Sequence, residues 1–359
     1  MILRLRSRHF GRLQVELPPQ KGNCLVSPKD YEKKTPLAVG ISVLAILIAS
    51  CTQDDIQTVT IGTGGHDGTY QIVGHAISRT VNKDLEKHQI RIQDMTSSGS
   101  ISNISAIVAG DIEFGIAQAD HQHQAVNGLA AWQKQGPQND LRAVFSLYTE
   151  PVTLVAGGDT QINTIDDLMG RRVDIGTPGS GTRQNAIDVL SAAGIDWTTD
   201  IDAIEGNLDE RLATFMHGGL DAFFYTVGHP NMHIKFATYS VRGARIIPLA
   251  NIEQIVSTSP YYMKTFIPVD LYPQAKNSQD VETIGVKAIL LTSANVPDEI
   301  VYTVTKAVLE DLESLREIGP VFMSFGPAGL LGGVTAPIHS GALRYFEEAG
   351  IQIPPSSLQ

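Results

Sequence analysis

Cysteine is nearly absent from this chain of 359 residues, which contains only Cys24 and Cys51. A fold that depends on several disulfides is therefore excluded, and the chain has to be stabilised by a hydrophobic core. The 309 residues from Cys51 onward can build such a core, because they are enough for two ordinary domains or for one two-lobed body.

Positive charge is also scarce, with 27 Lys and Arg against 38 Asp and Glu and a formal net charge of −11. Residues 1–50 hold eight of these basic and three of these acidic residues, so the chain from residue 51 onward carries a net charge of −16. Such a surface repels nucleic acid and anionic lipid headgroups, and we expect neither as a partner. A small acidic ligand remains compatible, because a pocket of backbone amides attracts anions locally.

Several catalytic motifs are missing as well. The chain contains no His-Glu-x-x-His motif, no Gly-x-Ser-x-Gly nucleophile elbow and no Gly-Lys-[Ser/Thr] ending of a nucleotide-binding loop. We therefore predict that the protein is not an enzyme, has no catalytic residues and needs no cofactor.

Histidines offer three possible metal-binding sets, namely His121 with His123 on one strand face, His229 with His233 at helical ligand spacing, and His66 beside Asp67. No carboxylate motif accompanies them, and Pro230 disturbs the second set. We predict no metal site, and a metal-dependent hydrolase is kept as an alternative function.

A short apolar run, residues 37–49, ends just before Cys51 and follows Lys29, Lys33 and Lys34. The run is shorter than the roughly 20 residues of a membrane-spanning helix. Its basic flank, small residues and closing cysteine are typical of a lipoprotein signal peptide, although a short buried helix is an alternative. We predict that residues 1–50 are an N-terminal extension with this signal peptide, and that lipidated Cys51 anchors the protein to a membrane in the periplasm or at the cell surface.

From residue 58 onward, short β-branched runs alternate with amphipathic helical segments, which is typical of an α/β fold with mainly parallel sheets. A strand containing Val59 and Ile61, a glycine-rich loop and a helix at 72–85 form the first unit, and a strand at 172–175, a loop and a helix around 186–190 repeat it. Further predicted strands are 90–93, 114–116, 143–147, 152–155, 220–225 and 286–291, and further predicted helices are 101–108, 121–133, 208–215, 298–313 and 340–348.

These elements predict two lobes. Residues 51–57 would be a linker, 58–148 the first part of lobe 1, 149–288 lobe 2, and 289–359 the return to lobe 1.

Four polar loops follow predicted strands, at the edge where open α/β sheets bind ligands. In the loop 176–182, glycines let backbone amides approach a ligand, and the following helix N-terminus favours an anion, although Ser180 or Thr182 could instead simply cap that helix. We predict a carboxylate-binding cleft between the lobes, with Ser180 and Thr182 holding the carboxylate and an aromatic wall from Tyr70 or Tyr225. The predicted ligand-binding residues are Thr63, Gly64, Gly65, His66, Tyr70, Ser98, Gly99, Ser100, Asn103, Gln118, Asp120, Thr177, Pro178, Gly179, Ser180, Gly181, Thr182, Tyr225 and Gly228.

Across residues 58–351 the sequence resembles the TAXI family, the solute receptors of one branch of TRAP transporters. Seven segments in order carry the resemblance: 61–65 with Gly68 and Tyr70, 98–100 with Asn103, 114–118 with Asp120, 141–144 with 147–148 and 150–151, 178–183, 221–224, and 285–292.

The resemblance implies a two-lobed periplasmic binding fold that closes on a small solute, an amino acid or a small carboxylate such as glutamate, and presents it to an ion-driven membrane permease. The chain departs from the family pattern at His66, Asp67, Gln71, Ala119 and His121. Our hypothesis is that His66 and Asp67 recognise an additional polar group of the ligand. A periplasmic sensing partner of a membrane signalling protein is the alternative from a different functional class.

Overall fold

The computed structural model describes residues 56–66, 68–206, 208–323, 325–326 and 329–353. All of them belong to one compact unit, residues 52–359. The predicted signal peptide, Cys51 and most of the predicted linker lie outside the described residues, as does Asp67. Within the described ranges, no helix is both long and apolar enough to cross a bilayer.

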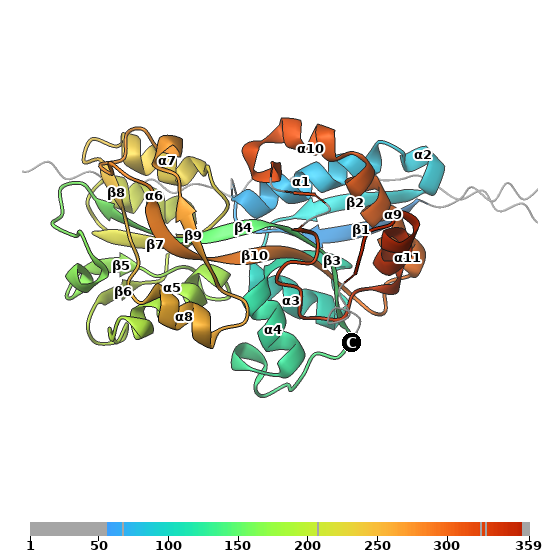
Figure 1. The fold of residues 1–359 in the computed structure, drawn as a ribbon, viewed down its shortest axis with the longest axis horizontal. Helices are drawn as coiled ribbons and strands as arrows, with labels where there is room; N and C mark the ends of the chain where they lie inside the picture. The colour runs from blue at the N-terminus through green and yellow to red at the C-terminus, as the bar shows by residue number, and fades with distance from the viewer. Residues whose placement is uncertain (1–55, 67, 207, 324, 327–328, 354–359) are drawn as a thin grey trace, which may run out of the picture. The chain divides into compact units, whose positions relative to one another are not determined.

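One mixed sheet runs through two α/β lobes (Figure 1), in the strand order β2-β1-β3-β10-β4-β7-β5-β6, with β8 paired to β4 and β9 to β10. The strands are β1 Gln57–Gly62, β2 Ile90–Met95, β3 Phe114–Gln118, β4 Leu141–Gly157, β5 Arg172–Asp174, β6 Asp202–Ile204, β7 Ala222–Thr226, β8 Ala244–Ile247, β9 Met263–Ile267 and β10 Val281–Ser293.

Each lobe contains the expected parallel pairs, β1 with β2 and β3 in lobe 1, and β5 with β6 and β7 in lobe 2. Two long antiparallel strands, β4 and β10, connect the lobes. The strands predicted at 143–147 and 152–155 are two halves of the continuous β4, which is buried along most of its length. Because β4 is covered on both faces, it lacks the alternating pattern that would have defined it as one strand.

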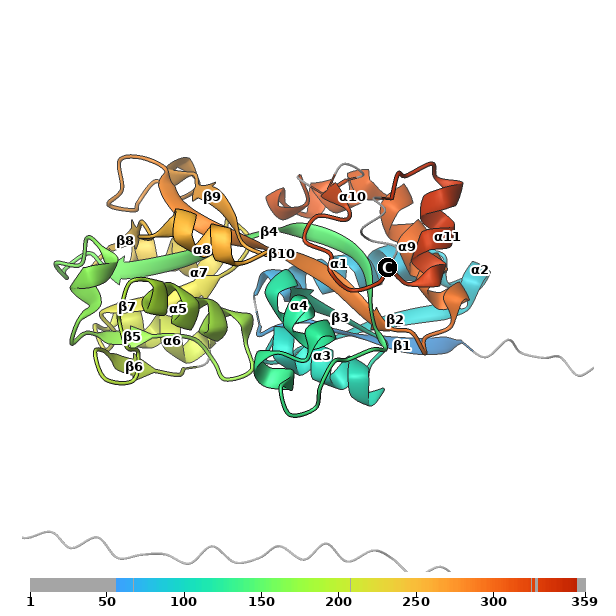
Figure 2. The same cartoon turned by 60° about the horizontal axis from the view of Figure 1, so that its bottom comes forward.

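Helices cover both faces of the sheet in each lobe (Figures 1 and 2). Lobe 1 contains α1 Thr69–Asn82, α2 Leu85–His88, α3 Ser100–Ala109, α4 Ala119–Asn127, α9 Asp298–Glu310, α10 Leu312–Ile318 and α11 Ser340–Glu348, with short 3₁₀ turns at Ala130–Trp132 and Pro320–Phe322. Lobe 2 contains α5 Gly181–Ala192, α6 Leu208–Met216, α7 Met232–Tyr239 and α8 Ile252–Thr258, with 3₁₀ turns at Ile165–Leu168 and Val269–Leu271.

The predicted helix at 340–348 is confirmed as α11, whereas two other predicted helices are wrong in extent. The helix predicted at 121–133 is α4, which ends at Asn127 because Gly128 adopts a left-handed φ of 65°. The helix predicted at 298–313 is interrupted at Asp311, which lies outside helical geometry and separates α9 from α10.

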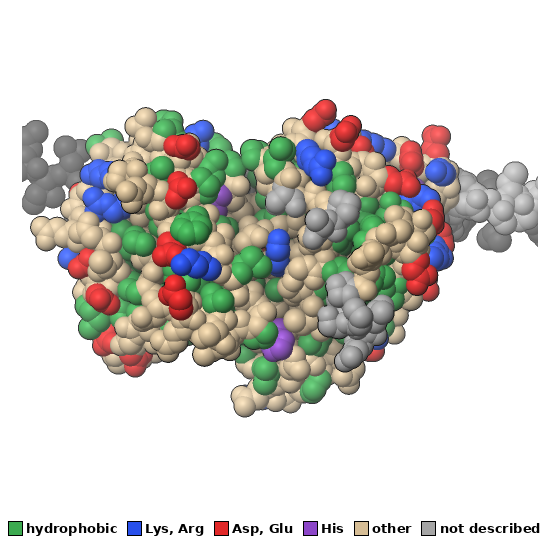
Figure 3. Space-filling model, in the orientation of Figure 1, with side chains coloured by type: hydrophobic (Ala, Val, Ile, Leu, Met, Phe, Trp, Pro, Cys, Tyr) green, Lys and Arg blue, Asp and Glu red, His purple; other side chains and the backbone are tan. Residues whose placement is uncertain are grey.

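Apolar side chains pack on both sides of the sheet. In lobe 1, Phe114, Phe145 and Phe346 belong to a buried cluster that also includes residues of α1, α9 and α11. In lobe 2, Phe215 and Phe223 meet edge to face, with ring centroids 5.0 Å apart. Figure 3 shows exposed acidic side chains over α10 and along the edge formed by α9 and α11.

Asn103 joins three buried segments of lobe 1. Its amide nitrogen lies 3.2 Å from the Gly62 carbonyl oxygen and 2.7 Å from those of Thr63 and Ile116. We expect Asn103→Ala to lower the free energy of unfolding by roughly 1–2 kcal/mol, because buried carbonyls lose a donor. Urea unfolding measures this change, and Ser105→Ala, exposed on the same helix, is the control. Equal unfolding midpoints for the two variants would contradict this role.

Candidate functional site

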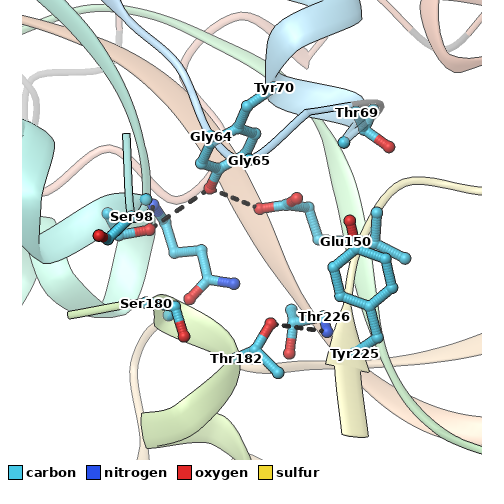
Figure 4. A pocket seen from close by; sticks show the side chains of 16 residues that line it. Gly64, Gly65, Thr69, Tyr70, Ser98, Glu150, Ser180, Thr182, Tyr225 and Thr226 are labelled. Atoms are coloured by element: carbon cyan, nitrogen blue, oxygen red, sulfur yellow. Dashed lines mark hydrogen bonds between the residues drawn. The ribbon is translucent and has the colours of Figure 1, made fainter. Parts of the chain in front are cut away.

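A cavity of about 90 Å³ lies between the lobes and is lined by both of them (Figure 4). Its lining residues come from the ends of strands and the starts of the following helices, and from β4 at the crossing. They are Gly64, Gly65, Gly68, Thr69, Tyr70, Ser98, Gly99, Ser100, Gln118, Glu150, Ser180, Gly181, Thr182, Tyr225, Thr226 and Val227.

Three helix N-termini contribute residues to this cavity. Helix α1 begins at Thr69, α3 at Ser100 and α5 at Gly181, and each of these residues lines it. No side chain caps α1 or α3 by a hydrogen bond. The first turns of helices present backbone N–H groups and a partial positive charge, so this arrangement is suited to an anionic group of a small ligand.

The loop before α5 positions Ser180 and Thr182 differently. The Ser180 hydroxyl donates to the Thr177 carbonyl at 2.6 Å and accepts from the Arg183 N–H at 3.3 Å, so Ser180 caps the helix. For Ser180, the structure therefore agrees with the alternative given above, in which this residue caps the helix. The Thr182 hydroxyl accepts from the Thr226 N–H at 3.2 Å. Its own proton has no acceptor among the described residues, so Thr182 can donate to a ligand.

Glu150 is the acidic residue of the cavity and is 2% exposed. The Tyr70 hydroxyl donates to its Oε2 at 2.8 Å, as the dashed line in Figure 4 shows. Burial raises the pKa of the Glu150 carboxyl to about 8, and the negative charge of Asp120 adds to the rise, whereas hydrogen bonds from Tyr70 and Gln118 offset part of it. Glu150 is therefore mostly protonated at neutral pH.

Polar atoms without a protein partner also lie at this cavity. Within the described residues, Gln118 Oε1 and Thr226 Oγ1 are buried and have no hydrogen-bond partner. Buried polar groups are normally paired, so unpaired ones at a cavity are suited to a polar ligand.

Contacts between the lobes surround the cavity. The Ile101 N–H donates to the Gly179 carbonyl at 3.2 Å. The Asn185 amide of lobe 2 donates to the Asp120 carboxylate of lobe 1 at 2.7 Å. The two lobes are thus hydrogen-bonded to each other on the sides of the cavity.

Most predicted ligand-binding residues line the cavity together: Gly64, Gly65, Tyr70, Ser98, Gly99, Ser100, Gln118, Ser180, Gly181, Thr182 and Tyr225. The remaining eight do not line it: Thr63, His66, Asn103, Asp120, Thr177, Pro178, Gly179 and Gly228.

Three of those eight are buried in lobe 1 and are occupied by protein contacts. The Thr63 hydroxyl donates to the Met95 carbonyl at 2.8 Å, and Asn103 joins the three segments described above. Asp120 accepts from the backbone N–H of His121 at 2.8 Å as well as from Asn185. These side chains support the cavity walls from behind.

The other five lie on loops around the cavity. Thr177 donates to the Gly206 carbonyl at 2.8 Å, Pro178 and His66 are exposed, and the carbonyls of Gly179 and Gly228 accept hydrogen bonds from the opposite lobe. The structure therefore places His66 outside the cavity lining, at 3.5 Å from the Gln71 amide.

The NMT1-like family model matches residues 61–350 of the chain. The chain belongs to the NMT1-like family. In fold, it is similar to the periplasmic binding protein BugD, with 11% identity and a TM-score of 0.52 over 82% of this chain and 98% of that chain. It is also similar to MatC (Rpa3494) from Rhodopseudomonas palustris with bound malate, with 14% identity and a TM-score of 0.51 over 77% and 90% of the two chains. The predicted two-lobed periplasmic binding protein fold is confirmed.

Sequence reasoning missed five lining residues of this NMT1-like protein, namely Gly68, Thr69, Glu150, Thr226 and Val227. A signal existed for Glu150, because an acidic residue inside an otherwise uncharged run from 143 to 156 is unusual for a buried strand. Thr226 and Val227 follow the predicted strand 220–225 directly, at the edge where ligands bind in such sheets.

Two of the three histidine sets considered above do not form, and the third, His66 with Asp67, is not tested because Asp67 lies outside the described residues. His121 and His123 both lie in α4, and His121 packs against Trp132, so the shared strand face is wrong. His229 precedes α7, while His233 is its second residue, so the two are not on one helix face. No group of three or more potential metal ligands occurs among the residues that the structure describes.

Proposed function

We propose that this NMT1-like protein is an extracytoplasmic solute receptor of the TAXI type. It captures a small carboxylate or amino acid, glutamate-like in size, and delivers it to a TRAP-type permease in the membrane. The observation that carries this proposal is the cavity between the lobes, where three helix N-termini and both lobes contribute the lining.

The size of the cavity supports a small solute. A volume of about 90 Å³ corresponds to roughly six to nine water-sized groups. Because ligand bridges two lobes, it favours the closed arrangement by as much as its affinities for the closed and open forms differ. The bound solute therefore sets how much closed receptor is available to the permease.

Binding without chemistry is the role that we assign to the cavity. None of its lining residues is His, Cys or Lys, and the carboxyl of Glu150 is engaged by Tyr70. A nucleophile activated by an adjacent base is therefore not part of the described lining.

Cys51 completes the proposal as the lipid anchor that holds the receptor at the membrane, in the periplasm or at the cell surface. The proposed lobes are 58–148 with 289–359, and 149–288, which divides β4 and β10 between them. Such a tether suits a protein that hands its ligand to a membrane permease.

A thermal-shift screen tests the proposed function. The purified protein is heated with L-amino acids, dicarboxylates and 2-oxo acids, because a ligand that binds only the folded state raises the melting temperature. A shift with members of these classes is the expected result. The absence of a shift with every member would overturn the proposal.

The Thr182 hydroxyl provides a prediction within this site. We expect Thr182→Ala to weaken binding of the solute with the largest thermal shift by about tenfold, which corresponds to the loss of one charge-assisted hydrogen bond. Isothermal titration calorimetry measures the affinity, and Thr214→Ala, exposed on α6, is the control. Unchanged affinity in Thr182→Ala would remove this hydroxyl from the ligand contacts.

A further inference from the structure

The lining of the cavity includes an acidic side chain but no basic side chain. Of its sixteen lining residues, Glu150 is the single acidic side chain, and none is Lys, Arg or His. Both partners of its carboxyl are uncharged, namely Tyr70, which donates to Oε2 at 2.8 Å, and the Gln118 amide. The environment therefore lacks the positive charge that a buried carboxylate normally requires.

Two other oxygen atoms of the cavity also lack hydrogen-bond partners in the part of the chain that the structure describes. Gln118 Oε1 and Thr226 Oγ1 are buried, line the same cavity and lack partners among the described residues. Together with the carboxyl of Glu150, they give the cavity several oxygen atoms that can accept hydrogen bonds from the N–H donors of a ligand. An ammonium group has three donors and a positive charge, and so meets both requirements.

We propose that Glu150 recognises an ammonium group of the solute, and that this ammonium group replaces the proton that Glu150 carries when no solute is bound. The proton leaves the carboxyl for the solvent, and no covalent bond of the solute changes. The inference rests on the proposed function and narrows it, because the solute carboxylate lies at the helix N-termini and its ammonium group at Glu150. Solutes without an ammonium group are the weaker ligands.

The groups that surround Glu150 allow this exchange near neutral pH. They are Tyr70 on α1, Tyr148 on β4 itself, Tyr225 on β7 and Asp120 on α4. On β10, the residue paired with Glu150 is a valine, which does not titrate. Burial first, and the Glu150 charge second, raise the pKa values of Tyr70 and Tyr148 well above the ordinary value, so these phenols keep their protons. The proton that is released when the solute binds therefore comes from the Glu150 carboxyl.

Titration calorimetry with matched solute pairs tests the proposal on the complete protein. Each pair has one carbon skeleton and differs in an ammonium or a keto group: L-glutamate with 2-oxoglutarate, L-aspartate with oxaloacetate, and L-alanine with pyruvate. We expect the ammonium member to bind at least about tenfold tighter at pH 7. Its binding heat should differ between phosphate and Tris buffers by the amount that corresponds to release of about one proton.

The outcomes separate this inference from the proposed function. If keto members bind as tightly as ammonium members, or if no proton is released, Glu150 does not recognise an ammonium group, but the receptor function stands. If no member of any pair binds, this inference is overturned, and the screen described above decides the proposed function.

The pH profile provides a test without any substitution. Below the pKa of Glu150 at about 8, the ammonium group has to displace a proton, so affinity should rise by close to tenfold per pH unit between pH 6 and 7.5 and level off above pH 8. A flat profile for the ammonium member would overturn the proposal.

The Glu150→Gln variant distinguishes recognition of the solute ammonium group by Glu150 from a purely structural role of this residue. We expect it to abolish proton release and to weaken the ammonium member by at least about tenfold, with the keto member changed less than about twofold. Glu347→Gln, exposed on α11, is the matched control and should bind both members as the unsubstituted protein does. Equal losses for both members in Glu150→Gln would assign Glu150 a structural role and overturn the inference.

Discussion

Replacement of Gly181 by valine is expected to weaken solute binding by about 100-fold, a loss of roughly 2.7 kcal/mol, while the fold is retained. Gly181 is the first residue of α5 and faces Gln118 across the gap between the lobes. A Cβ atom at this position would lie 1.8 Å from Gln118 Oε1 and 2.3 Å from Gln118 Cδ. Side chains do not tolerate such distances, so Gln118 has to move.

Moving the Gln118 side chain should cost little stability but should change the shape and hydrogen bonding of the cavity. Gln118 is a flexible side chain at the end of β3, so the lobes need not separate to accommodate valine. Its amide is, however, a hydrogen-bond partner of Glu150 and its carbonyl oxygen faces the cavity. The displaced amide and the new methyl groups both reduce a space of about 90 Å³.

Titration calorimetry and thermal unfolding together check this prediction. Gly319→Val is a suitable control, because a Cβ at Gly319 has no atom within 4 Å and its φ of 175° is accessible to any residue. We expect both variants to unfold within a few degrees of the unsubstituted protein. If Gly181→Val bound the solute normally, the cavity would not be the binding site.

The local elements could be predicted because their signals are local. The first strand, the loop at 62–65 and α1 follow from a β-branched run, consecutive glycines and helical spacing of apolar residues. The continuity of β4 is different, since it depends on pairing with β10 from a segment more than a hundred residues later. No local pattern encodes that pairing, so the sequence predicted two strands where β4 is one.

The candidate site could be predicted only to the level of its loops. Polar residues after strands mark the edge of the sheet, but they do not distinguish a side chain that faces the ligand from one that supports the wall. Asn103 and Ser100 lie on the same helix three residues apart, yet Ser100 lines the cavity and Asn103 binds carbonyls behind it. That difference depends on where β1 and β3 pack against α3.

The contribution of Glu150 to stability should decrease as the pH rises from about 4.5 to about 8, and Glu150→Gln should remove most of this decrease. The pKa of Glu150 is about 8 in the folded protein, compared with an ordinary value of 4.5. The folded state therefore binds the proton more tightly than the unfolded state does. The resulting stabilisation is fully present below pH 4.5 and is lost as the pH rises through 8, for a total of about 5 kcal/mol.

His229 has the opposite effect on the pH dependence of stability, and it does so at lower pH. Burial lowers its pKa from 6.5 to about 3, and its ring nitrogens contact the hydroxyls of Thr153 at 2.9 Å and Tyr272 at 2.6 Å. The unfolded state binds this proton more tightly, so the contribution of His229 is complete above pH 6.5 and is lost as the pH falls towards 3. The two effects oppose each other between about pH 4.5 and 6.5.

Above pH 6.5 the Glu150 contribution can be measured without interference from His229. Between pH 6.5 and 9, the free energy of unfolding of the unsubstituted protein should fall by about 2 kcal/mol through Glu150, because one pKa unit corresponds to 1.36 kcal/mol. Glutamine keeps the shape and can still accept from Tyr70, but it does not titrate, so Glu150→Gln should show a nearly flat profile. Urea unfolding at several pH values measures both profiles. Parallel profiles would mean that Glu150 does not bind its proton more tightly in the folded state, and the physical basis for solute-linked proton release would be lost with it.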